Sequence, residues 1–289
     1  MYTLKNEQLT IKINPKGAEL VSVYGADYEY LWQGDTAFWG RTSPVLFPIV
    51  GRLAKNTYFV DGVAYELPQH GFARDMDFEC ISQTDDEIWF ALKATEETLA
   101  KYPFAFELRI GYRLLIQKVE VLWEVENHGT SEMPFSIGAH PAFNAGEELA
   151  DYALQMATHK DIETRFIDNG RFVEVLDGPE QIIEGLPFLP LNKDFFEEYP
   201  TLMIEDETEV TLRSYYHDRE VDVNFDGFPL VAFWSPINVA GEVAPFVCIE
   251  PWYGLSDTSE KPGELMDKLG IEVLESEKVF KTSYTMTFR

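Results

Sequence analysis

Two polar side chains, His140 and Glu250, each follow an apolar run and directly precede a proline. Proline has no backbone N–H and a fixed φ, so we expect a regular strand to end at Pro141 and another at Pro251. The residue before a proline is also held extended. A rigid strand end suits a polar side chain that faces a cleft. A histidine and a glutamate held across one cleft form an acid and base pair, because burial would raise the pKa of the glutamate towards neutrality.

Both residues also have an ordinary structural interpretation. His140 would then be a core or turn histidine that satisfies a backbone group, and Glu250 a salt-bridged glutamate at a strand end. Glutamate is rarely buried without a partner, so the apolar residues before Glu250 suggest that this side chain has a specific partner or role. The two residues alone leave both interpretations open.

Further polar and aromatic residues would suit a polyhydroxylated substrate. A glycine precedes Arg52 and another follows His70, and a glycine lets the backbone approach a site closely. Their ordinary alternatives are a surface ion pair for Arg52 and a turn position for His70. Trp234, Trp252 and Tyr253 offer faces on which a sugar ring can stack. Together with the acid and base pair, these residues predict proton transfer on a sugar.

The elements that must position these residues are mostly strands. Val119, Val121, Trp123 and Val125 alternate with residues of the opposite face, which is typical of a β-strand. Asp61-Gly62 supplies the positive φ of a two-residue hairpin turn, and residues 168–171 predict another turn. Further strands are expected at 9–13, 18–24, 28–32, 77–82, 87–94, 108–116, 210–214, 221–223, 228–234, 246–249 and 279–288.

Helical patterns are short and confined to residues 95–101 and 262–269. No internal repeat or linker interrupts the chain. The sequence therefore predicts an all-β fold, a single large antiparallel domain over residues 1–289, for which two packed sheets or a closed barrel both fit.

Composition excludes several classes of partner. The formal charge of −27 predicts no nucleic-acid partner and no anionic membrane surface, since both need clustered Lys and Arg. No run approaches the ~20 apolar residues of a membrane span, and the first residues hold no apolar signal core. Cys80 and Cys248 form no disulfide framework and lack metal-ligand spacing. We expect a cytoplasmic protein.

Four segments in this order resemble the aldose 1-epimerase (galactose mutarotase) superfamily. They are Gly-Arg at 51–52, Gln-His-Gly-Phe-Ala-Arg at 69–74, Gly-Ala-His-Pro-Ala-Phe-Asn at 138–144 and Ile-Glu-Pro-Trp-Tyr-Gly at 249–254. The sequence is most similar to the LacX-like branch, with kinship to glucose-6-phosphate 1-epimerases. The resemblance covers essentially the whole chain and implies a large antiparallel β-supersandwich.

The resemblance also implies roles for six residues. Glu250 would be the general base that takes the proton of the anomeric hydroxyl, and His140 the general acid that protonates the ring oxygen. His70 and Arg52 would bind sugar oxygens. Arg74 and Trp234 would complete the pocket. A protonated imidazole facing an ionised carboxylate is then expected, with each group favouring the charged form of the other.

The resemblance implies no cofactor and no metal, since neither the redox state nor the carbon skeleton changes. The expected partner is a monosaccharide such as galactose or glucose, and the expected assembly a monomer or a homodimer. Family members usually carry an aspartate that contacts the sugar. Asp194 is a possible counterpart, although the residues around it match poorly.

Three functions remain open. The first is a mutarotase for free aldohexoses. The second is a hexose-6-phosphate 1-epimerase, for which Arg52, Lys55 and Arg74 could form a basic subsite, although the charge of −27 disfavours steering of a dianion. The third is a sugar-binding protein of the same fold without activity.

Overall fold

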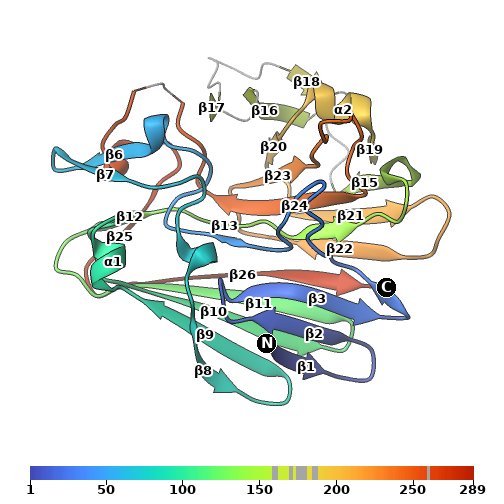
Figure 1. Cartoon of the computed structure of the whole chain (residues 1–289), viewed down its shortest axis with the longest axis horizontal. Helices are drawn as coiled ribbons and strands as arrows, with labels where there is room; N and C mark the ends of the chain where they lie inside the picture. The colour runs from blue at the N-terminus through green and yellow to red at the C-terminus, as the bar shows by residue number, and fades with distance from the viewer. Residues whose placement is uncertain (158–161, 169–171, 174–180, 184–187, 259–260) are drawn as a thin grey trace.

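The computed structural model describes residues 1–157, 162–168, 172–173, 181–183, 188–258 and 261–289. Two large antiparallel sheets form most of this described part (Figure 1). The first, here called the β11 sheet, has nine strands in the order Phe188–Pro190 (β19), Tyr152–Met156 (β15), Glu209–Ser214 (β21), Glu220–Asn224 (β22), Val279–Phe288 (β26), Lys118–Asn127 (β11), Phe106–Leu115 (β10), Glu87–Lys93 (β9) and Glu79–Gln83 (β8).

The second sheet, here called the β24 sheet, carries the strands that matter for the site. Its order is Phe172–Val173 (β17), Ile162–Asp168 (β16), Leu202–Glu205 (β20), Leu230–Trp234 (β23), Phe246–Tyr253 (β24), Ile137–Ala139 (β13) and Val45–Leu46 (β5). In addition, Ala142–Asn144 (β14) pairs with β24, and Gln181–Ile183 (β18) pairs with β16. In the described chain both strand orders are open, so the stacked sheets are observed and not the closed barrel.

Smaller sheets and short helices complete the fold. A four-stranded sheet comprises Tyr2–Lys5 (β1), Thr10–Asn14 (β2), Glu19–Gly25 (β3) and Tyr28–Glu29 (β4). Two two-stranded sheets pair Thr57–Val60 (β6) with Val63–Glu66 (β7), and Met133–Phe135 (β12) with Glu272–Leu274 (β25). The helices are Glu96–Leu99 (α1) and Lys193–Glu198 (α2), with 3₁₀ turns at Ala54–Asn56 (η1), Ala73–Asp75 (η2), Leu149–Asp151 (η3) and Leu265–Asp267 (η4).

The alternating pattern of β11 builds the core as predicted. Val119, Val121, Trp123 and Val125 are all buried, and the residues between them are partly exposed. They share one apolar cluster with Val247 and Ile249 of β24, whose side chains alternate to the same face. Figure 1 shows β24 in the layer above β26, β11 and β10. The predicted supersandwich of two facing sheets is therefore confirmed.

Several local predictions are confirmed, and others are wrong. Asp61 and Gly62 have φ of 50° and 76° in the β6–β7 turn, and the 95–101 helix is present as α1, capped by Thr95. At 262–269 only the 3₁₀ turn η4 forms. Of the predicted turn at 168–171, residues 169–171 lie outside the described residues. No helix in the described chain is long and apolar enough to cross a membrane.

Candidate active site

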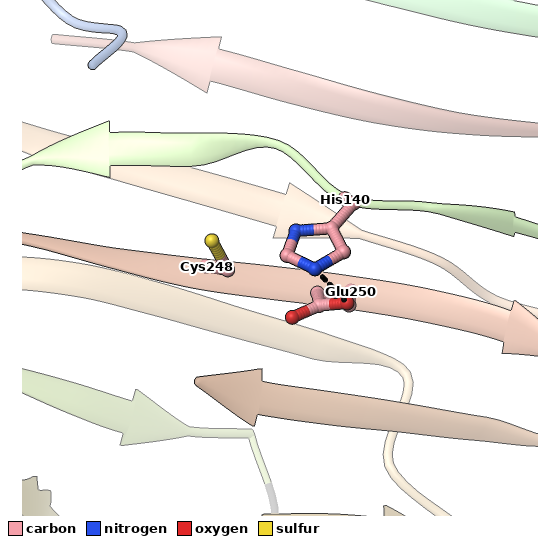
Figure 2. Close-up of side chains that lie close together, drawn as sticks. All are labelled: His140, Cys248 and Glu250. Carbon is pink, nitrogen blue, oxygen red and sulfur yellow. Dashed lines mark ion pairs between the residues drawn. The ribbon is translucent and has the colours of Figure 1, made fainter. Parts of the chain in front are cut away.

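The break at Pro141 places His140 directly across from Glu250. β13 ends at Ala139 and β14 begins at Ala142, and both strands pair with β24 in one register. Gly138 faces Trp252 and Ala142 faces Cys248, so the residue opposite His140 in this register is Glu250. The His140 Nε2 atom lies 3.2 Å from Glu250 Oε2 (Figure 2). The strand end predicted at His140 is confirmed.

The strand end predicted at Pro251 is wrong, because β24 continues through this proline to Tyr253. Backbone N–H groups alternate between the two sides of a strand. The Ile249 N–H donates to the Pro141 carbonyl, so the Pro251 nitrogen points to the same side, where β13 and β14 are interrupted. Its missing N–H therefore costs no ladder hydrogen bond, and a proline is tolerated inside this strand.

One pocket collects all six residues singled out in the sequence. Its volume is about 380 Å³, and Arg52, His70, Arg74, His140, Trp234 and Glu250 line it. This volume lies in the range of small-molecule sites. Trp39, Arg41 and Trp252 also line the pocket. The structure thus brings the candidate acid and base together with three arginine side chains.

Other residues considered in the sequence lie elsewhere. Tyr253 points to the opposite face of β24, where its ring contacts Phe228 and Phe280, so its predicted stacking on a sugar is wrong. Asp194 is exposed in α2 and Lys55 in η1, and neither lines the pocket. The third basic residue of the pocket, next to Arg52 and Arg74, is therefore Arg41 and not the predicted Lys55.

His70 is held as a neutral hydrogen-bond donor. Its φ is 65° and that of Gly71 is 68°, so the turn interpretation also applies. The Gly51 N–H donates to His70 Nδ1 at 3.1 Å. Burial, followed by the charges of His140 and Arg74, lowers the pKa of His70 well below its ordinary value. Because Nδ1 accepts in a neutral ring, Nε2 carries the hydrogen. With Nε2 protonated, the Gln69 amide 3.2 Å away must present its oxygen, and a sugar oxygen can take its place as the acceptor.

The loop that carries Arg52 is fixed by its backbone. The Arg52 N–H donates to Ser256 Oγ at 3.0 Å, and its carbonyl accepts from the Asp257 N–H at 2.8 Å. Gly51 has φ of 73°, and a Cβ there would lie 2.0 Å from Ser256 Oγ, so the close backbone approach expected at this glycine is confirmed. Among the described residues no carboxylate forms an ion pair with Arg52, and its side chain is exposed towards the pocket.

Arg74 and Arg41 form a cationic wall next to this loop. Arg74 Nη2 donates to the Gln69 carbonyl at 2.7 Å, and burial together with Arg41 lowers the pKa of Arg74 to about 10. Arg41 pairs with Asp75 at 3.0 Å. The Arg74 Nε atom is buried without a hydrogen-bond partner in the described structure. It lies 3.9 Å from Asp75 Oδ2, so both arginines of the wall face the same carboxylate.

Aromatic rings enclose the His140 imidazole. Trp39 stacks on it with ring centroids 4.7 Å apart and planes 26° apart. Trp234 contacts it edge-on at 5.6 Å. The His140 side chain is 9% exposed and that of Glu250 1%. Sequence reasoning missed Trp39, which belongs to an irregular loop. A tryptophan between Phe38 and Gly40 was the available signal.

Burial acts against the charge of both members of the pair. Burial, followed by the charge of Arg74, lowers the pKa of His140 to about 3. Burial raises the pKa of Glu250 well above its ordinary value. Both shifts oppose the expected imidazolium facing a carboxylate, because burial disfavours the charged form of each group.

Three possible metal ligands also meet at this point. Donor atoms of His140, Cys248 and Glu250 all lie within 4.8 Å of one another (Figure 2). The sequence spacing of Cys248 indicated no such group. The cysteine joins it because residues 248 and 250 share one face of β24 and the register brings His140 opposite.

Comparisons with known proteins agree with this fold. The aldose 1-epimerase family model matches residues 1–269. Protein LacX of Lactococcus lactis subsp. lactis is 33% identical, with 98% of each chain covered.

Solved structures lead to the same family. That of a galactose mutarotase related enzyme from Lactobacillus acidophilus is 34% identical with a TM-score of 0.91, covering 100% of this chain and 97% of its own. A galactose mutarotase-like protein from Lactobacillus casei ATCC 334 is 32% identical with a TM-score of 0.90, and 100% of both chains is covered. These similarities establish that the chain belongs to the aldose 1-epimerase family.

Proposed function

We propose that this protein is an isomerase that interconverts the α and β anomers of an aldohexose. The observation that carries the proposal is the 3.2 Å approach of His140 Nε2 to Glu250 Oε2 in a pocket of sugar-binding size. An acid and a base at this distance can serve two oxygens bonded to one carbon, and the anomeric carbon of a pyranose carries such a pair.

Ring opening then needs two proton transfers. Glu250, as carboxylate, takes the proton of the O1 hydroxyl, and the O1 electron pair forms the C1 carbonyl. The C1–O5 bond breaks, and O5 takes a proton from the His140 imidazolium. The open aldehyde rotates about C1–C2 and closes by the reverse transfers, which gives the other anomer.

The electrostatics of the site favour this direction of proton flow. Ring opening moves one proton from His140 to O5 and one from O1 to Glu250, so its net effect is a transfer from imidazole to carboxyl. Burial lowers the pKa of His140 and raises that of Glu250. Burial therefore favours the neutral imidazole and protonated carboxyl that follow opening, whereas forming the ionised pair that begins it costs free energy that interactions with the bound sugar must offset.

The other pocket residues bind the sugar in this proposal. The His70 Nε2–H and the Arg52 guanidinium donate to sugar oxygens and stabilise developing negative charge. Trp39 and Trp234 supply apolar faces for the C–H surface of the ring. Both tryptophans contact the His140 ring, which keeps the imidazole oriented.

Anomer exchange in variants tests the proposal. We expect His140→Ala and Glu250→Gln each to lower kcat by about 10³-fold, the usual size of an acid or base contribution, as measured by polarimetry or two-dimensional exchange NMR on galactose and glucose. Asp194→Asn is the matched control and should leave the rate unchanged. Exchange no faster than the spontaneous rate in the wild type, unchanged in folded His140→Ala and Glu250→Gln proteins, would instead indicate a sugar-binding protein without activity.

A hexose 6-phosphate is the second candidate substrate. Arg41, Arg52 and Arg74 line one pocket in a chain with a net charge of −27, and arginine forks match phosphate oxygens. Anomer exchange on free and 6-phosphorylated glucose separates the candidates. If the substrate is phosphorylated, kcat/KM is higher for glucose 6-phosphate than for glucose. Arg74→Met then lowers kcat/KM for the phosphate ester selectively.

A further inference from the structure

We propose that His140, Cys248 and Glu250 form a binding site for Zn²⁺, and that the metal blocks the pocket when it binds. The donor atoms of the three side chains lie within 4.8 Å of one another. Figure 2 shows the thiol and the carboxylate on β24, with the imidazole reaching towards the same strand from the β13–β14 break. All three residues are buried. Binding is independent of the proposed function, whereas inhibition rests on it.

The donor set suits zinc in both chemistry and number. Zn²⁺ accepts imidazole nitrogen, thiolate sulfur and carboxylate oxygen, and accessible zinc sites have three protein ligands and one open position. His140 and Glu250 line the pocket, so the open position would face it. The alternative Glu107, Glu126 and His128 cluster is less suitable, because both carboxylates already pair with Arg109.

The distances require only a small adjustment. Nitrogen and oxygen ligands at ~2.0–2.1 Å from a tetrahedral zinc lie roughly 3.4 Å apart, and Nε2 and Oε2 are 3.2 Å apart. A sulfur ligand at ~2.3 Å would lie roughly 3.6 Å from either atom. The Cys248 sulfur, within 4.8 Å of both, must approach by at most about 1 Å.

Unpaired polar atoms at the site favour a cation. His140 Nδ1 is buried without a hydrogen-bond partner in the described structure. Glu250 Oε2 also lacks a hydrogen bond there, although it lies 3.2 Å from His140 Nε2, and a buried carboxylate without a hydrogen bond is costly. Arg74 and Arg41 oppose a cation here. A free Nδ1 also lacks the outer-shell acceptor that strengthens zinc-bound histidines. We therefore infer reversible binding, weaker than in a structural zinc site.

Inhibition follows from the identity of the ligands. The metal would use the His140 nitrogen and the Glu250 oxygen that the proposed reaction needs. It would also occupy the space of the anomeric oxygens. Zinc should therefore compete with the sugar, and a chelator should restore the rate.

Cobalt replaces zinc as the spectroscopic probe. Chelator-treated protein titrated with Co²⁺ should develop a thiolate-to-cobalt charge-transfer band that saturates at one ion per chain and disappears on addition of Zn²⁺. Cys248→Ser and Cys248→Ala should both lack this band, whereas Cys80→Ser and His128→Ala should retain it. Absence of the band in the wild type, or its persistence in either Cys248 variant, overturns the proposal.

Anomer exchange supplies a second readout. We expect Cys248→Ser to keep the metal-free rate and to require more than about tenfold higher Zn²⁺ for half inhibition than the wild type and Cys80→Ser. Equal zinc sensitivity of the Cys248 variants contradicts the proposal. If the wild type catalyses no anomer exchange, only the proposed function is contradicted. The cobalt band tests the metal site independently of activity.

Discussion

His70 shows how a single backbone hydrogen bond prepares a side chain for a ligand. The Gly51 N–H donates to Nδ1 at 3.1 Å, so the remaining ring nitrogen must donate. The same pair of loops carries a second bond, from the His70 N–H to the Gly51 carbonyl at 2.8 Å. Arg52 and His70, which lie 18 positions apart in the sequence, therefore reach one pocket as a unit.

Two substitutions of His70 separate its structural and binding roles. His70→Ala leaves the buried Gly51 N–H unpaired, and we expect it to lose about 1–3 kcal/mol of stability together with kcat/KM. His70→Asn offers an oxygen near the Nδ1 position and tolerates positive φ, so most of the stability should return while kcat/KM stays low. Thermal unfolding and anomer-exchange kinetics measure both effects. Full recovery of kcat/KM in His70→Asn would contradict a donor role for Nε2.

At the scale of elements, a buried ion pair beneath the pocket supports the Arg52 loop. Lys268 Nζ lies 3.1 Å from Asp257 Oδ1, and the lysine side chain is only 4% exposed. Asp257 Oδ2 also accepts from the Ala54 N–H at 2.7 Å. The Asp257 N–H donates to the Arg52 carbonyl. The lysine thus acts on Arg52 through Asp257 as a positioning residue.

Removing this lysine should damage both folding and substrate binding. We expect Lys268→Met to cost about 3 kcal/mol, because it leaves a largely buried carboxylate without its partner, and to raise KM more than it lowers kcat. Lys268→Met combined with Asp257→Asn should recover part of the stability. Lys101→Met, which breaks an exposed pair with Glu97, is the control at about 0.5 kcal/mol. An unchanged KM in Lys268→Met would remove the positioning role.

The edge of the β11 sheet carries a pH-dependent contribution to stability. Trp89 Nε1 donates to Glu87 Oε1 at 2.6 Å, and this bond, assisted by Arg113, lowers the pKa of Glu87. A carboxyl with a depressed folded-state pKa contributes stability above its unfolded pKa of about 4.3, and the contribution disappears as pH falls through the folded value. Trp89→Phe should therefore lower Tm more at pH 7 than at pH 3. An equal loss at both pH values would show that only packing changed.

At the scale of the whole molecule, the net charge of −27 opposes the local cations of the pocket. A phosphorylated sugar approaches through a repulsive field and then meets Arg41, Arg52 and Arg74. Between about 10 and 150 mM salt the screening length falls from ~30 to ~8 Å. We expect kcat/KM for a hexose 6-phosphate to rise over this range and that for a neutral aldose to stay constant. A fall in kcat/KM for the phosphate ester with rising salt would mean that attraction by the three arginines outweighs repulsion by the net charge during association.

The sequence by itself determined the features that rest on local rules. The alternation of β11, the Asp61-Gly62 turn and the break at Pro141 follow from strand periodicity and from the fixed φ of proline, which act over a few residues. The motifs around residues 52, 70, 140 and 250 were also sufficient to select residues that line the pocket. A family resemblance depends on the order and the residue types of such motifs, and both can be read from the sequence.

Only the tertiary structure decided which of these residues lie together and how deeply they are buried. Pro251 lies within β24 because its nitrogen faces a gap in a neighbouring strand more than 100 positions away in the sequence. Trp39, Arg41 and Cys248 join the site through loop packing and register, which no local pattern encodes. Burial shifts the pKa values of His140 and Glu250 against their charged forms, and burial is a property of everything that packs around them.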